Sequence, residues 1–258
     1  MMMDFSSQVI SQALAADSAG QAERRAVLVF ADALAEDLAR RRWPESFQPL
    51  LQTQTFDAEW GIGADVHFFT AAGNTLPDLP ASITIHAQQG AAFAERLENA
   101  VETLAGLGYT QVVIVGRDCP DLEAADIERA FEQLDDHKLV LGPDHRGGCY
   151  LIALYLGDRA RLNGICWQQN TDCAELTRRF GSDQTALLPV KLDLDSVADI
   201  RLLTRSTSRW RYLAAELLRS LASGVTPFLF QPFISSQAFL RVLWQLPPPS
   251  DSSHAITA

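Results

Sequence analysis

The residues best suited to chemistry follow directly after an apolar run. Val112-Val-Ile-Val leads into Gly116-Arg-Asp-Cys-Pro-Asp-Leu122, which places Asp118 and Asp121 on either side of a proline and a cysteine. Such a run predicts a strand buried on both faces of a parallel sheet, and ligands bind beyond the carboxyl ends of these strands. Two carboxylates there suit a hard divalent cation that carries phosphates. The alternative is structural: Asp118 ends the strand, and Asp121 caps a helix over residues 123–134.

A second acidic group follows a later predicted strand, residues 186–190. Lys191-Leu-Asp-Leu-Asp-Ser196 supplies Asp193 and Asp195, either of which could give a metal its second carboxylate from another strand end. The alternative is a turn followed by the cap of a helix that contains Asp199. The sequence leaves both interpretations open.

The loop over residues 143–148 combines a histidine, an arginine and two glycines. Gly147 and Gly148 allow backbone to approach a ligand closely, or they form a simple turn. His145 is an acceptor-side base, a phosphate ligand or a solvated side chain. Arg146, like Arg117, weakens a nearby metal site by repulsion but can bind phosphate bidentately on its own.

Predicted strands and helices alternate along most of the chain. Strands are expected at residues 26–31, 65–70, 82–86, 112–115, 138–142, 149–154 and 186–190, and helices at 45–55, 91–107, 123–134 and 173–180. The helix over 91–107 has the clearest apolar periodicity. This alternation predicts an α/β fold with a mainly parallel, doubly wound sheet.

Both ends of the chain differ from this central region. Residues 1–22 predict a flexible segment, 23–206 the α/β domain, 207–246 a helical, aromatic-rich extension, and 247–258 a disordered tail. Prolines interrupt the aromatic extension, which falls short of the ~20 apolar residues of a membrane span. It is expected to pack on the sheet or on a second copy in a homodimer.

Composition narrows the function further. A formal net charge of -11 argues against broad binding to nucleic acid. The 4 cysteines lack zinc-site spacing and predict reduced thiols. No basic region followed by an apolar stretch opens the chain, so a cytoplasmic protein is expected.

Five motifs in the same order resemble those of a bacterial family known as arsenosugar-biosynthesis glycosyltransferases or radical-SAM/selenodomain-associated transferases. These proteins are nucleotide-diphospho-sugar transferases with a GT-A fold. The family's Gly-Ser-Asp-Cys-Pro-Asp-Leu is similar to residues 116–122, and its Gln-x-Gly segment with Leu-Gly-Glu-Arg is similar to residues 88–97. Its Asp-Gly-Gly-Tyr-Tyr loop, Gly-Ile-x-Trp and Asp-Val-Asp-Thr are similar to residues 142–154, 164–167 and 193–196.

The resemblance implies a GT-A-like sheet with a helical C-terminal extension and transfer of a sugar from a nucleotide-diphosphate-sugar to a small acceptor. It implies Mg²⁺ or Mn²⁺ bound by Asp118 with Asp193 or Asp195, and catalytic roles for Asp118, Asp121 and His145. The substrate-binding residues expected are Gln88, Gly90, Arg96, Arg117, Arg146, Gly147, Gly148 and Trp167. For Arg96 the alternative is pairing with a neighbouring carboxylate, and for Trp167 it is packing in the core.

The departures from the family bear on activity. Arg117 replaces the family's serine, Arg146 replaces its aspartate, and the amino-terminal phosphate loop has no clear match, although Arg40, Arg41 and Arg42 follow the first strand. The alternatives are a nucleotidyltransferase of the same fold, which normally needs such a loop, and a binding or scaffolding protein that has lost catalysis.

Overall fold

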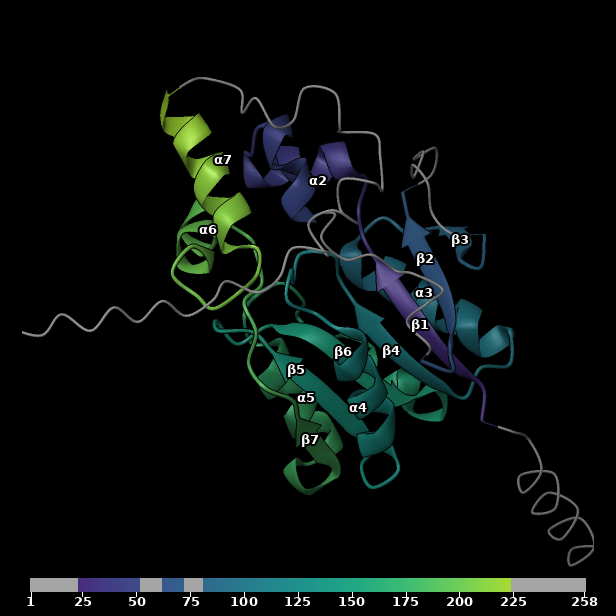
Figure 1. The fold of residues 1–258 in the computed structure, drawn as a ribbon. Helices are drawn as coiled ribbons and strands as arrows, with labels where there is room; N and C mark the ends of the chain where they lie inside the picture. Colours follow the sequence, from purple (N-terminus) through teal and green to yellow (C-terminus); the bar gives the residue numbers. More distant parts are fainter. Residues whose placement is uncertain (1–22, 52–61, 72–80, 224–258) are drawn as a thin grey trace, which may run out of the picture.

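A seven-stranded sheet forms the centre of the protein. The computed structural model describes residues 23–51, 62–71 and 81–223, and its strands lie in the order β3-β2-β1-β4-β6-β5-β7 (Figure 1). Their bounds are β1 Arg25–Phe30, β2 Asp65–Thr70, β3 Thr84–Ala87, β4 Gln111–Val115, β5 Leu139–Pro143, β6 Cys149–Tyr155 and β7 Thr185–Leu187. The predicted α/β sheet is confirmed.

The two central strands are the most deeply buried. Every residue of β4 is buried, and β1 is buried from its second residue onward. β1 pairs in parallel with β2 on one side and with β4 on the other. Among the described strands β6 alone is reversed, since it runs antiparallel to both β4 and β5.

Helices cover both faces of this sheet. On one face, alternate residues of β1 and β4 pack with α3 (Phe93–Gly106) and α5 (Asp172–Phe180), beside the 3-10 segment η3 (Leu156–Leu162). On the other face, the intervening residues pack with α4 (Ala124–Leu134). The apolar periodicity of α3 places Phe93, Leu97, Ala100, Val101 and Leu104 on one stripe. The last four are buried, and Phe93 packs partly buried against the same core.

A third apolar cluster lies at the end of the sheet toward which β1 and β2 point (Figure 1). It joins α2 (Leu34–Arg41) and the 3-10 segment η1 (Glu45–Leu51) to α6 (Val197–Leu203) and α7 (Arg211–Ser223). Phe47, Leu50 and Leu217 are fully buried there. Segments from the two ends of the described chain therefore share one core above the carboxyl ends of the strands.

Some local expectations need correction. Glu123, not Asp121, is the N-cap of α4, where it forms a capping box with Asp126. The helix expected over residues 45–55 is the 3-10 segment η1 as far as Leu51, and its remainder lies outside the described residues. The predicted segments 1–22 and 247–258 and the aromatic residues 228–244 also lie outside them.

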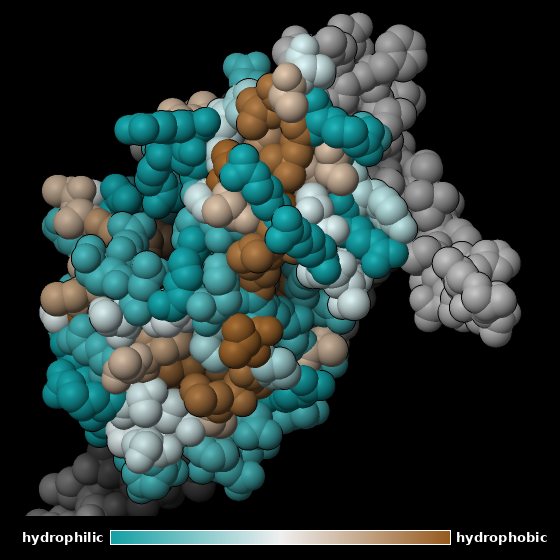
Figure 2. All heavy atoms as spheres, turned by 90° about the vertical axis from the view of Figure 1, so that its left-hand side faces the viewer, coloured by the Kyte–Doolittle hydropathy of each residue, from teal (hydrophilic) through white to brown (hydrophobic). Residues whose placement is uncertain are grey.

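The face formed by α6, α7 and β7 carries apolar side chains among polar ones, visible as brown areas in Figure 2. The large apolar side chains exposed on α6, α7, β7 and the residues just after β7 are those of Leu187, Val190, Leu202 and Leu221. Within the described residues, no helix is both long and apolar enough to cross a membrane. The homodimer expected through residues 207–246 stays a prediction.

Candidate functional site

A pocket of about 480 Å³ opens at the carboxyl ends of β1 and β4. Its lining comes from the loops after these strands, the loop between β5 and β6, residues 167–172 before and at the start of α5, and the segment that contains Asp193 and Asp195. β1 lies between β2, the next strand along the chain, and β4, so the order of strands reverses direction at β1 and β4. The pocket thus occupies the topological switch point, where open α/β sheets bind ligands.

The acidic groups of two distant motifs meet in this pocket. Asp118, Asp193 and Asp195 each offer an oxygen, and these oxygens all lie within 4.8 Å of one another. A backbone hydrogen bond of 2.8 Å from Leu194 N–H to the Asp118 carbonyl joins the two segments. Burial and the neighbouring carboxylates raise the pKa of Asp193, and its Oδ1 is buried without a hydrogen-bond partner.

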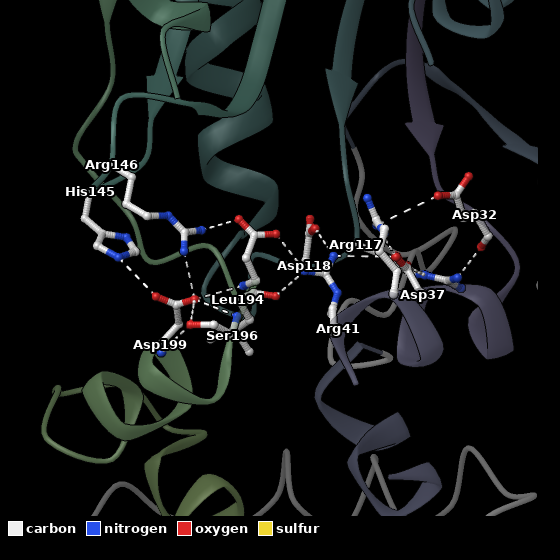
Figure 3. A network of polar contacts seen from close by, with 12 residues as sticks. Asp32, Asp37, Arg41, Arg117, Asp118, His145, Arg146, Leu194, Ser196 and Asp199 are labelled. Carbon is white, nitrogen blue, oxygen red and sulfur yellow. Dashed lines mark hydrogen bonds and ion pairs between the residues drawn. The ribbon is translucent and has the colours of Figure 1, made fainter. Parts of the chain in front are cut away.

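Arg41, in the last turn of α2, lies between two of these carboxylates (Figure 3). Its guanidinium donates to Asp118 Oδ2 at 2.5 Å, to Asp195 Oδ1 at 2.7 Å and to the Leu194 carbonyl at 2.6 Å. Only 3% of the side chain is exposed. Burial works against its charge, but Asp118, Asp37 and Asp195 outweigh this effect and raise the pKa of Arg41.

Arg117 points away from the acidic cluster. Its Nε lies 3.3 Å from Asp37 Oδ2, and it also donates to the backbone carbonyl of Asp32 (Figure 3). Burial lowers the pKa of Arg117. This residue therefore ties the end of β4 to α2 and to the loop after β1, although it also borders the pocket.

Arg146 contacts the far side of the cluster. It donates to Asp195 Oδ2 and, at 2.9 Å, to Asp199 Oδ2 (Figure 3). His145 Nε2 lies 3.2 Å from Asp199 Oδ1, and His145 does not line the pocket. Asp199 has a structural role as well, because it forms the capping box of α6 with Ser196. Hydrogen bonds from Ser196 and the charge of Arg146 outweigh burial and lower the pKa of Asp199.

Asp144 holds the loop that carries Arg146. Its Oδ1 accepts backbone N–H bonds from Arg146, Gly147 and Gly148 at 2.6, 2.7 and 2.9 Å. Gly147 has φ +103°, and a Cβ there would lie 2.5 Å from the Asn170 carbonyl oxygen. The conformation and packing of the loop therefore require glycine at this position.

Cys149, at the start of β6, is joined to Cys173 of α5 in a disulfide. The expectation that all cysteines are reduced is therefore wrong for this pair, while Cys119 and Cys166 form no disulfide. Without zinc-like spacing or a dense cysteine framework, the sequence carries no signature that pairs residues 24 positions apart. The bond links the pocket wall at Cys149 to α5.

Of the predicted residues Gln88, Arg96 and Trp167, Trp167 alone lines the pocket. Gln88 donates to the carbonyls of Ala31 and Phe69, both at 3.1 Å, and so joins the ends of β1 and β2. Arg96 lies 3.5 Å from Asp32. Trp167 lines the pocket, and its Nε1 is buried without a partner.

Asp121 and Gly90 also lie outside the pocket lining, as His145 does. Asp121 Oδ1 accepts a hydrogen bond of 2.6 Å from Ser208 Oγ, which ties it to the segment before α7. Gly90 precedes α3 with φ +129°, and a Cβ there would lie 2.8 Å from Glu95 Cγ. Neither Asp121 nor Gly90 contributes to the pocket wall.

Sequence reasoning missed Asp37 and Asp172. Asp37 is buried and pairs with Arg40, Arg41 and Arg117. It lies four residues before Arg41, a spacing that could have indicated an ion pair between them on one helix. Asp172 lines the pocket at the first turn of α5, where its Oδ1 is buried without a partner. Burial raises the pKa of Asp172 from 3.8 to about 6.

Comparison with known proteins agrees with this architecture. Residues 61–169 match the model of a family described as an uncharacterized protein conserved in bacteria, DUF2064. No curated protein matches the chain.

Solved structures of similar fold include a Desulfovibrio desulfuricans G20 protein proposed to be a nucleotide-diphospho-sugar transferase. The match has a TM-score of 0.62 and 24% identity and covers 78% of this chain and 96% of that chain. The match to Rv0371c from Mycobacterium tuberculosis H37Rv has a TM-score of 0.50 and 18% identity and covers 72% of this chain and 100% of that chain. The match to the Anaerococcus prevotii DSM 20548 4-diphosphocytidyl-2C-methyl-D-erythritol synthase has a TM-score of 0.51 and 10% identity and covers 70% of this chain and 94% of that chain. The chain has the GT-A-like α/β fold of the nucleotide-diphospho-sugar transferases.

Proposed function

We propose that this protein binds a nucleotide-diphosphate-sugar in the pocket and transfers the sugar to a small acceptor. The observation that carries the proposal is the pocket at the switch point of a GT-A-like sheet, lined by alternating arginines and carboxylates. The lining combines Arg40 and Arg146 with the apolar residues Phe93, Leu97 and Trp167. The ring centroids of Phe93 and Trp167 lie 6.2 Å apart. Guanidinium groups bind phosphate oxygens bidentately, and aromatic faces pack against a base or sugar ring.

A divalent metal, which would neutralise a leaving diphosphate as a Lewis acid, does not fit the cluster as it is arranged. Three carboxylates suit Mg²⁺ or Mn²⁺ as donors, but Arg41 already bonds to Asp118 and Asp195. A metal would have to compete with its guanidinium for Asp118 Oδ2 and Asp195 Oδ1. We therefore assign the diphosphate charge to arginines, chiefly Arg146 and Arg40, whose side chains are 25% and 48% exposed. On binding, they would exchange their carboxylate partners, Asp195 and Asp199 for Arg146 and Asp32 and Asp37 for Arg40, for phosphate oxygens.

Asp172 is suited to activate the acceptor. Its carboxylate lines the pocket, and a pKa near 6 is close to the range in which a general base works well at neutral pH. In the proposed step, the acceptor oxygen forms a bond to the anomeric carbon as the bond from that carbon to the diphosphate breaks. The acceptor proton passes to Asp172, and the nucleoside diphosphate leaves against Arg146. His145, the base expected from the sequence, is instead turned toward Asp199.

A nucleotidyltransferase is the second candidate, because the Anaerococcus prevotii synthase shares the fold. That reaction releases pyrophosphate from a nucleoside triphosphate, whereas sugar transfer releases a nucleoside diphosphate. The loop after β1 in this chain, Ala31-Asp-Ala33, has neither glycine nor lysine, which favours sugar transfer.

A thermal-shift screen with uridine, guanosine, cytidine, adenosine and thymidine diphosphates and their sugars tests the proposal. A ligand at a hundredfold excess over its Kd stabilises the fold by about 2.7 kcal/mol, which raises the Tm by several degrees. We expect one nucleotide class to stabilise the wild-type protein and Arg219→Ala, a surface control, but to stabilise Arg146→Ala less. No stabilisation by any of these compounds would refute the proposed function and favour a protein without catalysis.

A further inference from the structure

We infer that Arg41 is the resident cation of the Asp118–Asp193–Asp195 cluster, in the place where a divalent metal would otherwise bind. The intact protein then holds its diphosphate ligand without Mg²⁺ or Mn²⁺, and removal of the guanidinium turns the cluster into a divalent metal site. The first statement rests on the proposed function, whereas the second concerns the cluster alone.

The contacts of Arg41 are those of a bound cation. Two of its nitrogens reach carboxylates from two different segments, at 2.5 Å from Asp118 Oδ2 and 2.7 Å from Asp195 Oδ1. Mg²⁺ binds oxygen at about 2.0–2.1 Å, so a metal on these oxygens would occupy the volume that the guanidinium fills. Two cations that close would also repel each other.

The surrounding fold keeps Arg41 in place. α2 ends directly after it, at Arg42 with φ 56°, and its neighbours Leu38 and Trp43 are buried in the third apolar cluster. Leu194, which lies between the two acidic residues of its segment, is buried in the same cluster. One core therefore fixes both the helix that carries the guanidinium and the segment that carries its carboxylate partner.

A second arginine completes the neutralisation. The other oxygen of Asp195 is paired with Arg146, so each oxygen of this carboxylate contacts a guanidinium. Asp118 and Asp195 are thus paired with Arg41 and Arg146, two cations that belong to the chain, and Arg146 also pairs with Asp199. A diphosphate can approach this wall without first recruiting a divalent metal.

Direct Mn²⁺ titration, followed by the electron paramagnetic resonance of free Mn²⁺, tests the inference. The variants are Arg41→Ala, Arg41→Gln, Asp118→Asn, the double variant Arg41→Ala/Asp118→Asn, and Arg219→Ala as a surface control whose residue pairs with nearby Glu216. We expect the wild-type protein and Arg219→Ala to bind Mn²⁺ weakly at this cluster. The Arg41 variants should bind at least about tenfold tighter, a change of about 1.4 kcal/mol, and Asp118→Asn should abolish that gain.

Two results would overturn the inference. One is tight Mn²⁺ binding by the wild-type protein that Asp118→Asn removes, a measurement that needs no Arg41 variant to fold. The other is a folded Arg41 variant, verified by circular dichroism, that gains no affinity for Mn²⁺.

Titration of nucleoside diphosphates in EDTA and in Mn²⁺ tests the proposed function separately. Absence of binding under both conditions refutes the proposed function but leaves the Mn²⁺ result on Arg41 intact. Binding that requires Mn²⁺ refutes the inference and keeps the proposed function.

Discussion

Replacement of Asp172 by asparagine should make the protein more stable at neutral pH. The folded environment raises the pKa of Asp172 from 3.8 to about 6, chiefly by burial and also through Asp144, while hydrogen bonds from Gln168 and Gln169 oppose the rise. The carboxyl group therefore stabilises the fold when it is protonated. This contribution is fully present below pH 3.8 and is lost as the pH rises through about 6.

The size of the effect follows from the two pKa values. One pH unit corresponds to about 1.4 kcal/mol, so the rise from 3.8 to about 6 makes ionised Asp172 cost about 3 kcal/mol at pH 7. Asparagine carries no charge at any of these pH values. The free energy of unfolding of Asp172→Asn should exceed that of the wild type by up to about 3 kcal/mol at pH 7, and this advantage should fall below about 1 kcal/mol at pH 4.

Urea denaturation of both proteins at several pH values between 4 and 7.5 measures this difference, with Asp136→Asn on an exposed side chain as the control. Turnover provides an independent signature, because a more stable Asp172→Asn protein should transfer sugar far more slowly if Asp172 accepts the acceptor's proton. A difference in unfolding free energy that stays constant over this pH range would refute the reasoning.

Three further predictions concern stability. Burial lowers the pKa of both His67 and His86. The free energy of unfolding should therefore fall as the pH drops through the ordinary histidine pKa near 6.5. Urea titrations of His86→Gln should show a weaker pH dependence, and an unchanged pH profile would contradict this prediction. Leu217 is fully buried in the third apolar cluster, so Leu217→Ala should lower the free energy of unfolding by about 2–5 kcal/mol in urea denaturation. A loss below about 1 kcal/mol would show that this cluster is loosely packed. Gly147→Ala should lower the Tm because Gly147 has φ +103° and an added Cβ would meet the Asn170 carbonyl oxygen. Gly157→Ala, which has open space around the added Cβ, should leave the Tm unchanged. Equal effects of the two substitutions would contradict the role assigned to Gly147.

The sequence supports the fold better than the details of the site. The apolar run before Gly116 predicted a central buried strand, and β4 is buried throughout. The alternation of elements predicted the parallel pairs but not the reversal of β6, because an apolar run that is buried on both faces carries no record of its direction. The structural alternative for Asp121, a helix cap, is wrong because Glu123 forms the capping box and the hydroxyl of Ser208, 87 residues away, donates to the Asp121 side chain.

Arg41 shows why a site of this kind is hard to read from sequence. The acidic motifs identified Asp118, Asp193 and Asp195 as neighbours, since residues after two strands of one sheet converge at its edge. The arginine that binds them lies 77 residues before Asp118 and 154 before Asp195, on a helix whose position depends on the third apolar cluster. Within the sequence it is one of three consecutive arginines, and only packing distinguishes it from its neighbours.

In the proposed function, the pocket binds a nucleoside diphosphate and arginines balance its charge. Isothermal titration calorimetry with the nucleoside diphosphate selected in the screen, in EDTA, measures this binding without a divalent metal. We expect the wild-type protein to bind in EDTA with the same Kd as in Mn²⁺, and Arg146→Ala to bind about tenfold or more weakly, as expected for loss of a guanidinium–phosphate pair. Binding that appears only with a divalent metal, or that is unchanged in Arg146→Ala, would contradict this expectation.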